Sequence, residues 1–491
     1  MTDTVAQVGQ QSGELGVIDE LVSYARENLS VDQRDVDWTR NRLLEYFSEH
    51  SESLSELAQS GDISGAALND DAVMGILSAP PSRVEELFAI MREERGSTAA
   101  MQWLFDYCVA NGYVKKRQLD RNIRYVSNGL IVTINTAKPE FKTMRNAASG
   151  NAVDSSFAQC TICRENEGLA ARGKRTLRTV DVALAGDSFF WQFSPYGYFR
   201  QHGICVNQEH TPMHVDRRTF EHLLAFVQQF PEYFLGCNAA LPRIGGSVLA
   251  HDHYQGGGEL MPMQSAPAWK SFALPSEPDV RVEIIGWPAT ALRVLSADTD
   301  ALVRVCERIR TAWADYDNDS LDIHSHDEQG ERQSSVAPIA RILPADRAGE
   351  PPLYEMSLIL RNNAVSEQYP LGVFHAHPEY FFIKQEPIGL IEAMGLFVLP
   401  GRLVSQLDAL ERALADGTAL PEQISDFELA WNEVRAQLSG NESADGVRRI
   451  VRDEVGSICR RILGNIAVFP QFADTERFLR DLGCRSLQQS V

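Results

Sequence analysis

Seven residues near the middle of the chain, His251 to Gly257, read His-Asp-His-Tyr-Gln-Gly-Gly. If the segment from Ser247 to His253 is extended, alternate side chains share one face, so His251 and His253 lie together and Gln255 follows them. The two glycines would let the phosphates of a ligand approach the backbone closely. By itself, a His-x-His pair fits a surface strand or a metal clip as well as a nucleophilic histidine beside a phosphate cradle.

A second glycine-containing segment leads into this run and reads Asn-Ala-Ala-Leu-Pro-Arg-Ile-Gly-Gly-Ser. Its backbone N–H groups could stabilise charge on phosphoryl oxygens, since glycines leave the backbone open to a ligand. We predict that this segment binds the substrate through Asn238, Arg243, Gly245, Gly246 and Ser247.

Cys160 and Cys163 form a Cys-x-x-Cys turn, which supplies two thiolates. Zinc takes four ligands in a tetrahedron, so the two missing ligands should be histidines from elsewhere in the fold. His210 and His251 are the candidates. The alternative, that the cysteines are ordinary thiols or a redox pair, stays open, although no thioredoxin-like strand and helix surround them.

With these motifs in view, the chain resembles the galactose-1-phosphate uridylyltransferases of the histidine-triad superfamily, in their class II, bacterial form. Class I members carry His-Pro-His-x-Gln where this chain has His-Asp-His-Tyr-Gln. The similarity runs from about Asn128 to at least Arg402. The segments that carry it are Phe189 to Tyr196, Glu209 to Met213, Gly236 to Ala239, His251 to Gly257 and Gly389 to Gly395.

The resemblance implies a reaction and roles for residues. His253 would be the nucleophile, Gln255 would assist it, and His251 would join Cys160, Cys163 and His210 on a structural zinc ion. The implied activity is the transfer of UMP from UDP-glucose to galactose 1-phosphate, which yields UDP-galactose and glucose 1-phosphate in the Leloir pathway of galactose metabolism. The implied mechanism is ping-pong, through a uridylyl-histidine intermediate.

The expected fold class is α+β, with histidine-triad-like antiparallel sheets, packed helices, two related halves and an N-terminal helical extension. We divide the chain into an acidic helical extension, a catalytic half with the His-Asp-His-Tyr-Gln motif, a second half with a His-Ala-His strand, and C-terminal helices. These units span residues 1–127, 128–280, 281–402 and 403–491.

The acidic extension is set apart by its charge. Residues 1–114 contain 7 Lys or Arg against 20 Asp or Glu, a net charge of −13 out of −21 for the whole chain. Pro80-Pro81 followed by apolar residues at spacings of three and four predicts a helix that Gly96 stops, and Ser97 would cap the next helix. This pattern favours a packed helical unit with a solvated acidic face.

The catalytic half begins with a predicted strand, Gly129 to Asn135, followed by a polar loop. Cations in that loop, such as Lys138, could meet phosphate oxygens, although most basic loop residues are only solvated. Further on, Asp216 should cap a helix with an apolar stripe, which Pro231 closes.

In the second half, Tyr354 to Leu360 and Val373 to Ile383 are predicted strands. The second of them carries His375 and His377, for which a second metal site, substrate contact and a plain strand all remain open. Lys384 and Glu392 fall near the sugar-binding positions of the family, so the resemblance implies sugar contacts for them. Helices are expected over 403–416, 421–438, 446–463 and 475–482.

Composition excludes several functional classes. A net charge of −21 argues against a general nucleic-acid surface, because phosphate backbones require an excess of Lys and Arg. No run of about 18 apolar residues and no signal peptide is present, so we expect a cytoplasmic protein that does not enter a membrane. Eight cysteines, with only Cys160 and Cys163 closely spaced, fit reduced thiols. The expected partners are UDP-glucose and galactose 1-phosphate, and a homodimer is an open alternative.

Two rival functions remain. A histidine-triad hydrolase or phosphorylase acting on dinucleoside polyphosphates would use the same nucleotidyl-histidine chemistry, but that branch has a third histidine where this chain has Gln255. A non-catalytic sensor of nucleotide sugars would have no use for His253. Formation of UDP-galactose distinguishes the three functions.

Overall fold

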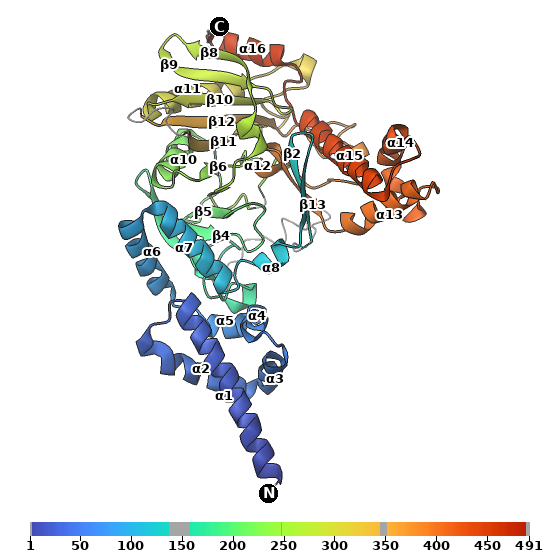
Figure 1. The fold of residues 1–491 in the computed structure, drawn as a ribbon. Helices are drawn as coiled ribbons and strands as arrows, with labels where there is room; N and C mark the ends of the chain where they lie inside the picture. Colours follow the sequence, from blue (N-terminus) through green and yellow to red (C-terminus); the bar gives the residue numbers. More distant parts are fainter. Residues whose placement is uncertain (1, 137–157, 247, 344–350, 488–491) are drawn as a thin grey trace.

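The computed structural model describes residues 2–136, 158–246, 248–343 and 351–487. It has the expected α+β class, with a large antiparallel sheet at its centre and helices at its N-terminus (Figure 1). Lys138 and Ser247, both predicted to bind substrate, lie outside the described residues. None of the helices in the described part of the chain is long and apolar enough to cross a membrane.

Helices α1 to α5 extend away from the sheet, whereas α6 packs against β3 (Figure 1). Pro81 opens α6 and Gly96 ends it with a φ of +85°, as predicted. Gly96 is also the N-cap of α7, so Ser97 stands one residue inside the helix and the predicted serine cap is wrong. The bounds are α1 Thr2–Asn28, α2 Val36–Glu49, α3 Ser51–Gln59, α4 Ile63–Ala67, α5 Asp71–Leu77, α6 Pro81–Arg95, α7 Ser97–Ala110 and α8 Lys116–Leu119.

The large sheet has eleven strands in the order β14-β8-β9-β10-β12-β11-β6-β7-β5-β4-β3. All of its pairings are antiparallel. The bounds are β3 Val180–Leu184, β4 Asp187–Phe193, β5 Gly203–Asn207, β6 Phe234–Gly236, β7 His253–Gly257, β8 Ala268–Leu274, β9 Glu277–Ile285, β10 Ala291–Ser296, β11 Ser334–Leu343, β12 Leu353–Asn362 and β14 Arg485–Ser486.

One connection pattern occurs twice in this sheet. Three consecutive strands, β3 to β5, are followed by helix α10 (Arg217–Gln229) and by β6 and β7, in the spatial order 3-4-5-7-6. Strands β8 to β10, helix α11 (Thr299–Ala314), β11 and β12 repeat this pattern in the order 8-9-10-12-11. The two sets join where Gly236 of β6 pairs with Ile339 of β11. This repetition agrees with the predicted pair of related halves.

The two repeated helices cover one face of the large sheet. Helix α10 contacts β3, β6 and β11, and α11 contacts β9, β10, β11 and β12. Asp216 caps α10 by accepting the N–H of Thr219, and Phe220, Leu223 and Val227 are buried, as the sequence predicted. Since the side chains of a strand alternate, the residues of β7 on the other face, His253 and Gln255, point away from these helices.

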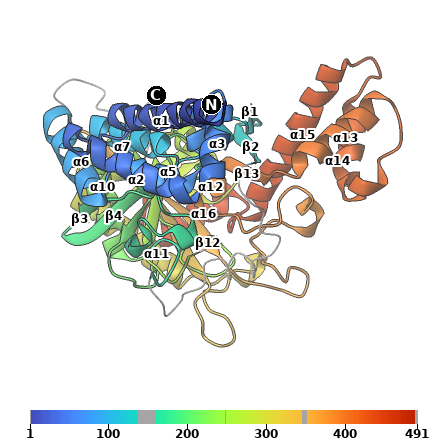
Figure 2. The ribbon, with the colours of Figure 1, turned by 90° about the horizontal axis from the view of Figure 1, so that it is seen from below.

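A small sheet stands beside the large one, in the order β1-β2-β13 (β1 Ile123–Ser127, β2 Leu130–Asn135, β13 Leu396–Pro400). Helix α15 packs on β1 and β2, and with α13 and α14 it projects to one side of the molecule (Figure 2). The predicted C-terminal helices are therefore present. Their bounds are α13 Leu403–Ala415, α14 Glu428–Gln437, α15 Ala444–Asn465 and α16 Phe472–Asp481.

Two predicted extended segments are wrong. Residues 373–383 form turns and a short 3-10 helix, η6 Pro378–Tyr380, so His375 and His377 stand in a loop and not on a strand. Pro378 has no N–H for a ladder, and Gly372 turns the chain with a φ of +144°. Residues 249–250 form a turn and His251 lies in a bend, so β7 starts only at His253 and the first two residues of the motif precede the strand.

Gly256 of β7 gives a first testable prediction. A Cβ there would meet the carbonyl oxygen of Phe234 at 2.0 Å, and that oxygen belongs to the backbone of the neighbouring strand β6. We expect Gly256→Ala to lower the free energy of unfolding by about 1–3 kcal/mol, because the two strands must separate. The control Gly464→Ala, in α15, has no atom within 4 Å of the new methyl and should gain about 0.5–1 kcal/mol. Urea titration measures both, and equal stability of the two variants would contradict the prediction.

Candidate active site and metal cluster

His253 opens strand β7 with its backbone opposite Val206 of β5. Its ring Nδ1 lies 2.8 Å from the carbonyl oxygen of His251. Because a carbonyl can only accept, Nδ1 carries the proton and Nε2 keeps its lone pair. Only 8% of the residue is exposed, and burial holds the pKa of His253 below its ordinary value. The result is a neutral imidazole with one defined tautomer and an available nitrogen.

Gln255 lies two residues further along β7, on the same face as His253 and half-buried. Its backbone pairs with Ile204 on one side and with Gly236 on the other, so strands on both sides fix its position. An amide side chain offers two N–H donors, which suits an acceptor that carries negative charge. An amide donor and the candidate nucleophile therefore share one face of β7.

The loop after β6 brings three of the predicted substrate contacts together. Gly245 and Gly246 have φ values of +115° and +81°. A Cβ at Gly245 would meet Oδ1 of Asn238 at 2.9 Å and Cα of Gly389 at 3.1 Å, so this turn accepts only glycine. Asn238 Oδ1 accepts the N–H of Leu390 at 3.0 Å. The loop is therefore tied directly to the second half of the chain.

Arg243, also predicted to bind substrate, is anchored in the same loop. Its Nη2 donates to the carbonyl oxygen of Asn363 at 2.8 Å, and Asn363 donates back to the carbonyl of Pro242 at 3.1 Å. The residue has a φ of +69°. These bonds fix the arginine within the loop, and its contact with substrate stays a prediction.

Cys160, Cys163, His210 and His251 come together, as predicted. Their ligand atoms all lie within 4.8 Å of one another, and they are the only such group among the residues that the structure describes. Nδ1 of His251 lies 3.3 Å from the Cys160 sulfur, Nδ1 of His210 lies 3.2 Å from the Cys163 sulfur, and the two sulfurs are 3.4 Å apart. One ion could therefore contact all four atoms.

The environment of the four cluster side chains favours the binding of a cation. Burial lowers the pKa of His251 to about 4 and raises the pKa of Cys163 to about 12. The imidazole is thus neutral at pH 7, whereas a buried thiolate is costly without a positive charge beside it. Nε2 of His251 lies 2.8 Å from the carbonyl of Asn207, which leaves Nδ1 free for a metal ion.

Several supporting residues were not assigned a role from sequence. The Asn166 side chain donates to the carbonyls of Cys160 and Cys163 at 2.7 and 2.9 Å, and Arg172 donates to the carbonyl of Cys160 at 2.9 Å. Asn166 follows the Cys-x-x-Cys turn by three residues, a position from which an amide can close the turn. The fully buried Arg361 holds the carbonyl of Ile388 at 3.0 and 3.1 Å. Nothing in the local sequence distinguishes it from any other strand residue.

Lys384 and Glu392 form an ion pair at 3.2 Å. Nζ of Lys384 donates to Glu386 at 2.8 Å, to Glu392 at 3.2 Å and to the carbonyl of Val398 at 3.2 Å. Glu392 also accepts the N–H of Gly389 at 3.2 Å. Although burial disfavours the charge, the two glutamates hold the pKa of Lys384 above its ordinary value. All three N–H groups of the lysine have acceptors, so the geometry supports the Gly389 turn, and contact with a sugar stays a prediction.

A second prediction follows for Lys384, which is 3% exposed. We expect Lys384→Met to lower the free energy of unfolding by roughly 3–5 kcal/mol, because it leaves Glu392 without its cation inside the protein. The control is Lys270→Met. Lys270 and Glu476 form a partly exposed ion pair, so this substitution should lower the free energy of unfolding by about 1 kcal/mol or less. Denaturant unfolding followed by circular dichroism compares the two, and similar losses would show that the Lys384 pair is no stronger than a surface pair.

His375 and His377 do not form a second metal group. Nδ1 of His375 is 2.9 Å from the carbonyl of Ala376, and Nε2 of His377 is 3.2 Å from the carbonyl of Val373. The ring of His377 stacks on Tyr369 at 4.1 Å. Within the described part of the chain, neither joins a group of three metal-ligating side chains. The prediction of a second metal therefore gains no support.

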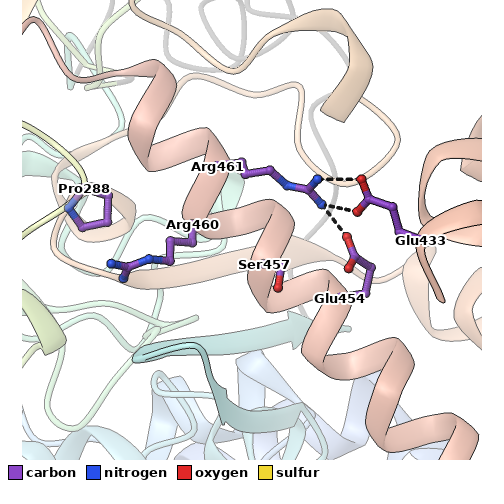
Figure 3. Close-up of a pocket in the computed structure, with 6 residues that line it drawn as sticks. All are labelled: Pro288, Glu433, Glu454, Ser457, Arg460 and Arg461. Atoms are coloured by element: carbon purple, nitrogen blue, oxygen red, sulfur yellow. Dashed lines mark hydrogen bonds and ion pairs between the residues drawn. The ribbon is translucent and has the colours of Figure 1, made fainter. Parts of the chain in front are cut away.

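A surface hollow of about 460 Å³ is lined mainly by residues of α14 and α15 (Figure 3). Arg461 is paired with both oxygens of Glu433 at 2.7 and 2.8 Å and also with Glu454. The remaining residues that line it are Pro288, Ser457 and Arg460. Because its central guanidinium is already paired with two carboxylates, we do not place the substrate there.

Comparison with known proteins identifies the relatives of the chain. A galactose-1-phosphate uridylyltransferase of Bifidobacterium longum subsp. longum is 53% identical and covers 95% of this chain and 97% of its own length. Proteins with the same name from Enterococcus faecalis and Halalkalibacterium halodurans are 34% and 33% identical, over 84% and 92% of this chain and 82% and 94% of their own. No family model matches. The solved structure of yeast Ap4A phosphorylase Apa2 matches 67% of this chain and 89% of its own at 10% identity and a TM-score of 0.34, which supports no conclusion.

These relatives define the class of the protein as a nucleotidyltransferase. Within that class, the chain belongs to the galactose-1-phosphate uridylyltransferase family.

Proposed function

We propose that this protein transfers UMP from UDP-glucose to galactose 1-phosphate, which yields UDP-galactose and glucose 1-phosphate. The observation that carries the proposal is the 53% identity to a galactose-1-phosphate uridylyltransferase over almost the whole of both chains. The arrangement around His253 supports it, because the reaction requires a nucleophile that is neutral and oriented at working pH. We also place the chain in the class II branch, on its His-Asp-His-Tyr-Gln motif.

The proposed reaction has two steps. Nε2 of His253 attacks the α-phosphorus of UDP-glucose, the N–P bond forms, and the bond to the bridging oxygen breaks with its electron pair leaving on glucose 1-phosphate. A phosphate oxygen of galactose 1-phosphate then attacks the same phosphorus, and the N–P bond breaks to return the lone pair to His253. The proton stays on Nδ1 of His253 throughout and is donated to the carbonyl oxygen of His251, so this carbonyl stabilises the positive charge that forms on the ring.

Charge on the phosphoryl oxygens requires donors near His253. Gln255 shares its face of β7, and the N–H groups around Gly245 and Gly246 belong to a turn that only glycine can form. A donor of this kind contributes roughly 3–4 kcal/mol to transition-state stabilisation in other enzymes. We propose these groups, with Asn238, Arg243, Ser247 and Lys138, as phosphate and nucleotide contacts, and Lys384 and Glu392 as residues that shape the sugar side.

We propose that the metal cluster holds a structural zinc ion. Around a tetrahedral zinc ion, neighbouring sulfur and nitrogen ligand atoms lie about 3.3–3.8 Å from one another. Here the Cys163 sulfur lies 3.2 Å from His210 Nδ1, the Cys160 sulfur lies 3.3 Å from His251 Nδ1, and the two sulfurs are 3.4 Å apart, which is close to that spacing. Thiolate and imidazole ligands suit zinc better than magnesium or calcium, which prefer oxygen. The ion would fix His251, whose carbonyl orients His253. All four ligands come from the protein, so the ion has no open position for substrate.

The remaining assignments extend this proposal. We propose that the enzyme acts in the cytoplasm, which its eight free cysteines support. A net charge of −21 supports small anionic substrates held at a local site and no nucleic-acid partner. The homodimer, and the division into units of residues 1–127, 128–280, 281–402 and 403–491, are proposed on the resemblance to the family.

Product analysis with both substrates tests the function. We expect UDP-galactose and glucose 1-phosphate in equal amounts, without release of UMP. Release of UMP without an acceptor sugar would favour the hydrolase, and binding without turnover would favour the sensor. Transfer of UMP to inorganic phosphate at a rate above that to galactose 1-phosphate would favour the phosphorylase.

A further inference from the structure

On the side of the catalytic motif that faces α10, four polar side chains are joined in a row by three hydrogen bonds. Oδ2 of Asp187 lies 2.7 Å from Nε2 of His222, and Nδ1 of the same ring lies 2.9 Å from the Tyr254 hydroxyl. That hydroxyl donates to Oδ2 of Asp252 at 3.4 Å. We call these four residues the polar chain. It links β4, helix α10 and the start of β7 with the residue before it, three segments that are distant in sequence.

The polar chain is buried in apolar surroundings for most of its length. His222, Tyr254 and Asp252 are 5%, 2% and 1% exposed, whereas the Asp187 side chain reaches the surface and pairs with Arg218 at 2.9 Å. The Tyr254 ring stacks on Phe189 at 5.5 Å. Polar groups at such positions cost free energy unless they bond to one another, so each member depends on its neighbours.

The inner end of the polar chain lies between the metal ligand and the nucleophile. The N–H of Asp252 donates to the carbonyl of Thr211 at 2.7 Å, and its carbonyl accepts the N–H of Asn207 at 3.0 Å. On one side of it stands His251, and on the other stands His253, whose ring is oriented by the His251 carbonyl. A shift of Asp252 would therefore move the group that sets the tautomer and direction of the nucleophile.

Alternate residues of the motif lie on opposite faces of strand β7. His253 and Gln255 share one face of β7, and Tyr254 between them points from the other face to α10. Helix α10 is thereby bonded to the reverse side of the catalytic strand through one hydroxyl group. The helix is fixed in turn by Asp187, which contacts both His222 and Arg218.

We propose that Asp252, Tyr254 and His222 are positioning residues, which hold the turn before β7 so that His253 faces the α-phosphorus at the correct angle. This inference rests on the proposed function, because it concerns the same nucleophile. None of the three side chains shares the face of His253, so their effect on the reaction passes through the backbone of the motif.

The test compares Tyr254→Phe with Tyr233→Phe. Both changes remove one buried hydroxyl, but among the described residues the Tyr233 hydroxyl has no hydrogen-bond partner. We expect Tyr254→Phe to slow uridylylation of the enzyme by UDP-glucose about 10-fold to 100-fold in rapid-quench experiments, because small misplacements of a reacting group have effects of this size. The KM for UDP-glucose should stay within about twofold, since the substrate contacts are intact. Tyr233→Phe should match the wild type.

A second pair of variants provides rescue. His222→Leu removes both ring nitrogens, whereas His222→Gln keeps a donor and an acceptor, so the glutamine variant should recover most of the lost rate. Melting temperatures and circular dichroism give the folded fraction, and the rates are compared per folded molecule. Equal rates in Tyr254→Phe, His222→Leu and the wild type overturn the inference. A loss of activity that is fully explained by a smaller folded fraction overturns it too.

The possible results distinguish a failure of the positioning role from a failure of the proposed function. An adduct in the wild type with unchanged rates in the variants overturns only the positioning role. Absence of both the adduct and UDP-galactose in the wild type overturns the proposed function and this inference with it.

Discussion

His253→Ala is expected to form no covalent adduct with UDP-glucose and to lose transferase activity by on the order of 10⁴-fold or more. The reason is that Nε2 of His253 supplies the electron pair for the N–P bond, and no other group on that face of β7 replaces it. Gln255, the nearest candidate on the strand, has an amide nitrogen whose lone pair is delocalised.

Intact-protein mass spectrometry after incubation with UDP-glucose alone measures the adduct directly. His324→Ala is a suitable control, because that side chain is 51% exposed in a loop and its Nδ1 lies 3.8 Å from the exposed carboxylate of Asp319. The control should gain the mass of one uridylyl group, like the wild type. An adduct that survives in His253→Ala would move the nucleophile to another residue, and His251→Ala would then be the variant to compare.

The parts of this fold that could be predicted are those decided by local chemistry. Asp216 caps α10, Gly96 ends α6, and apolar residues at spacings of three and four give both helices a buried side. Each of these effects acts within a turn or two of the chain, so the residues that cause it are visible in a short window. The Cys-x-x-Cys turn is equally local, and it fixed two of the four cluster positions in advance.

The prediction failed where long-range contacts decide the conformation. Residues 373–383 contain alternating apolar side chains, but Phe374, Ala376 and Phe382 are buried by packing of a loop and not by a sheet. The junction of the two strand sets depends on the pairing of Gly236 with Ile339, which are more than one hundred residues apart. Periodicity within one segment carries no information about such a partner.

The candidate site divides in the same way. His253, Gln255 and the four cluster residues were identified because they stand in short motifs, and family resemblance assigned their roles. The polar chain was not, because His222 looks like an ordinary residue of an amphipathic helix and Asp187 like the first residue of a strand. Their role appears only in the folded structure, where His222 of α10 bonds to both Tyr254 of β7 and Asp187.

Loss of the metal cluster is expected to have the largest effect on stability. We expect the double variant Cys160→Ser, Cys163→Ser to fall from about one zinc ion per chain to none, and to melt at least about 5 °C below the wild type, because structural zinc sites contribute binding free energy directly to folding. The control Cys306→Ala removes a buried thiol from α11 that belongs to no metal group in the described chain. Metal content by atomic emission and thermal melts measure both variants.

The same double variant separates a structural ion from a catalytic one. If all four side chains bind the ion, as proposed, no position is left for substrate, and loss of the ion should disturb the orientation of His253 and not remove the nucleophile. The double variant should therefore still form the uridylyl adduct at low temperature, more slowly than the wild type, whereas His253→Ala forms none. A zinc-free protein that is fully folded and yet forms no adduct would contradict the structural role, because the ion would then act in the reaction itself.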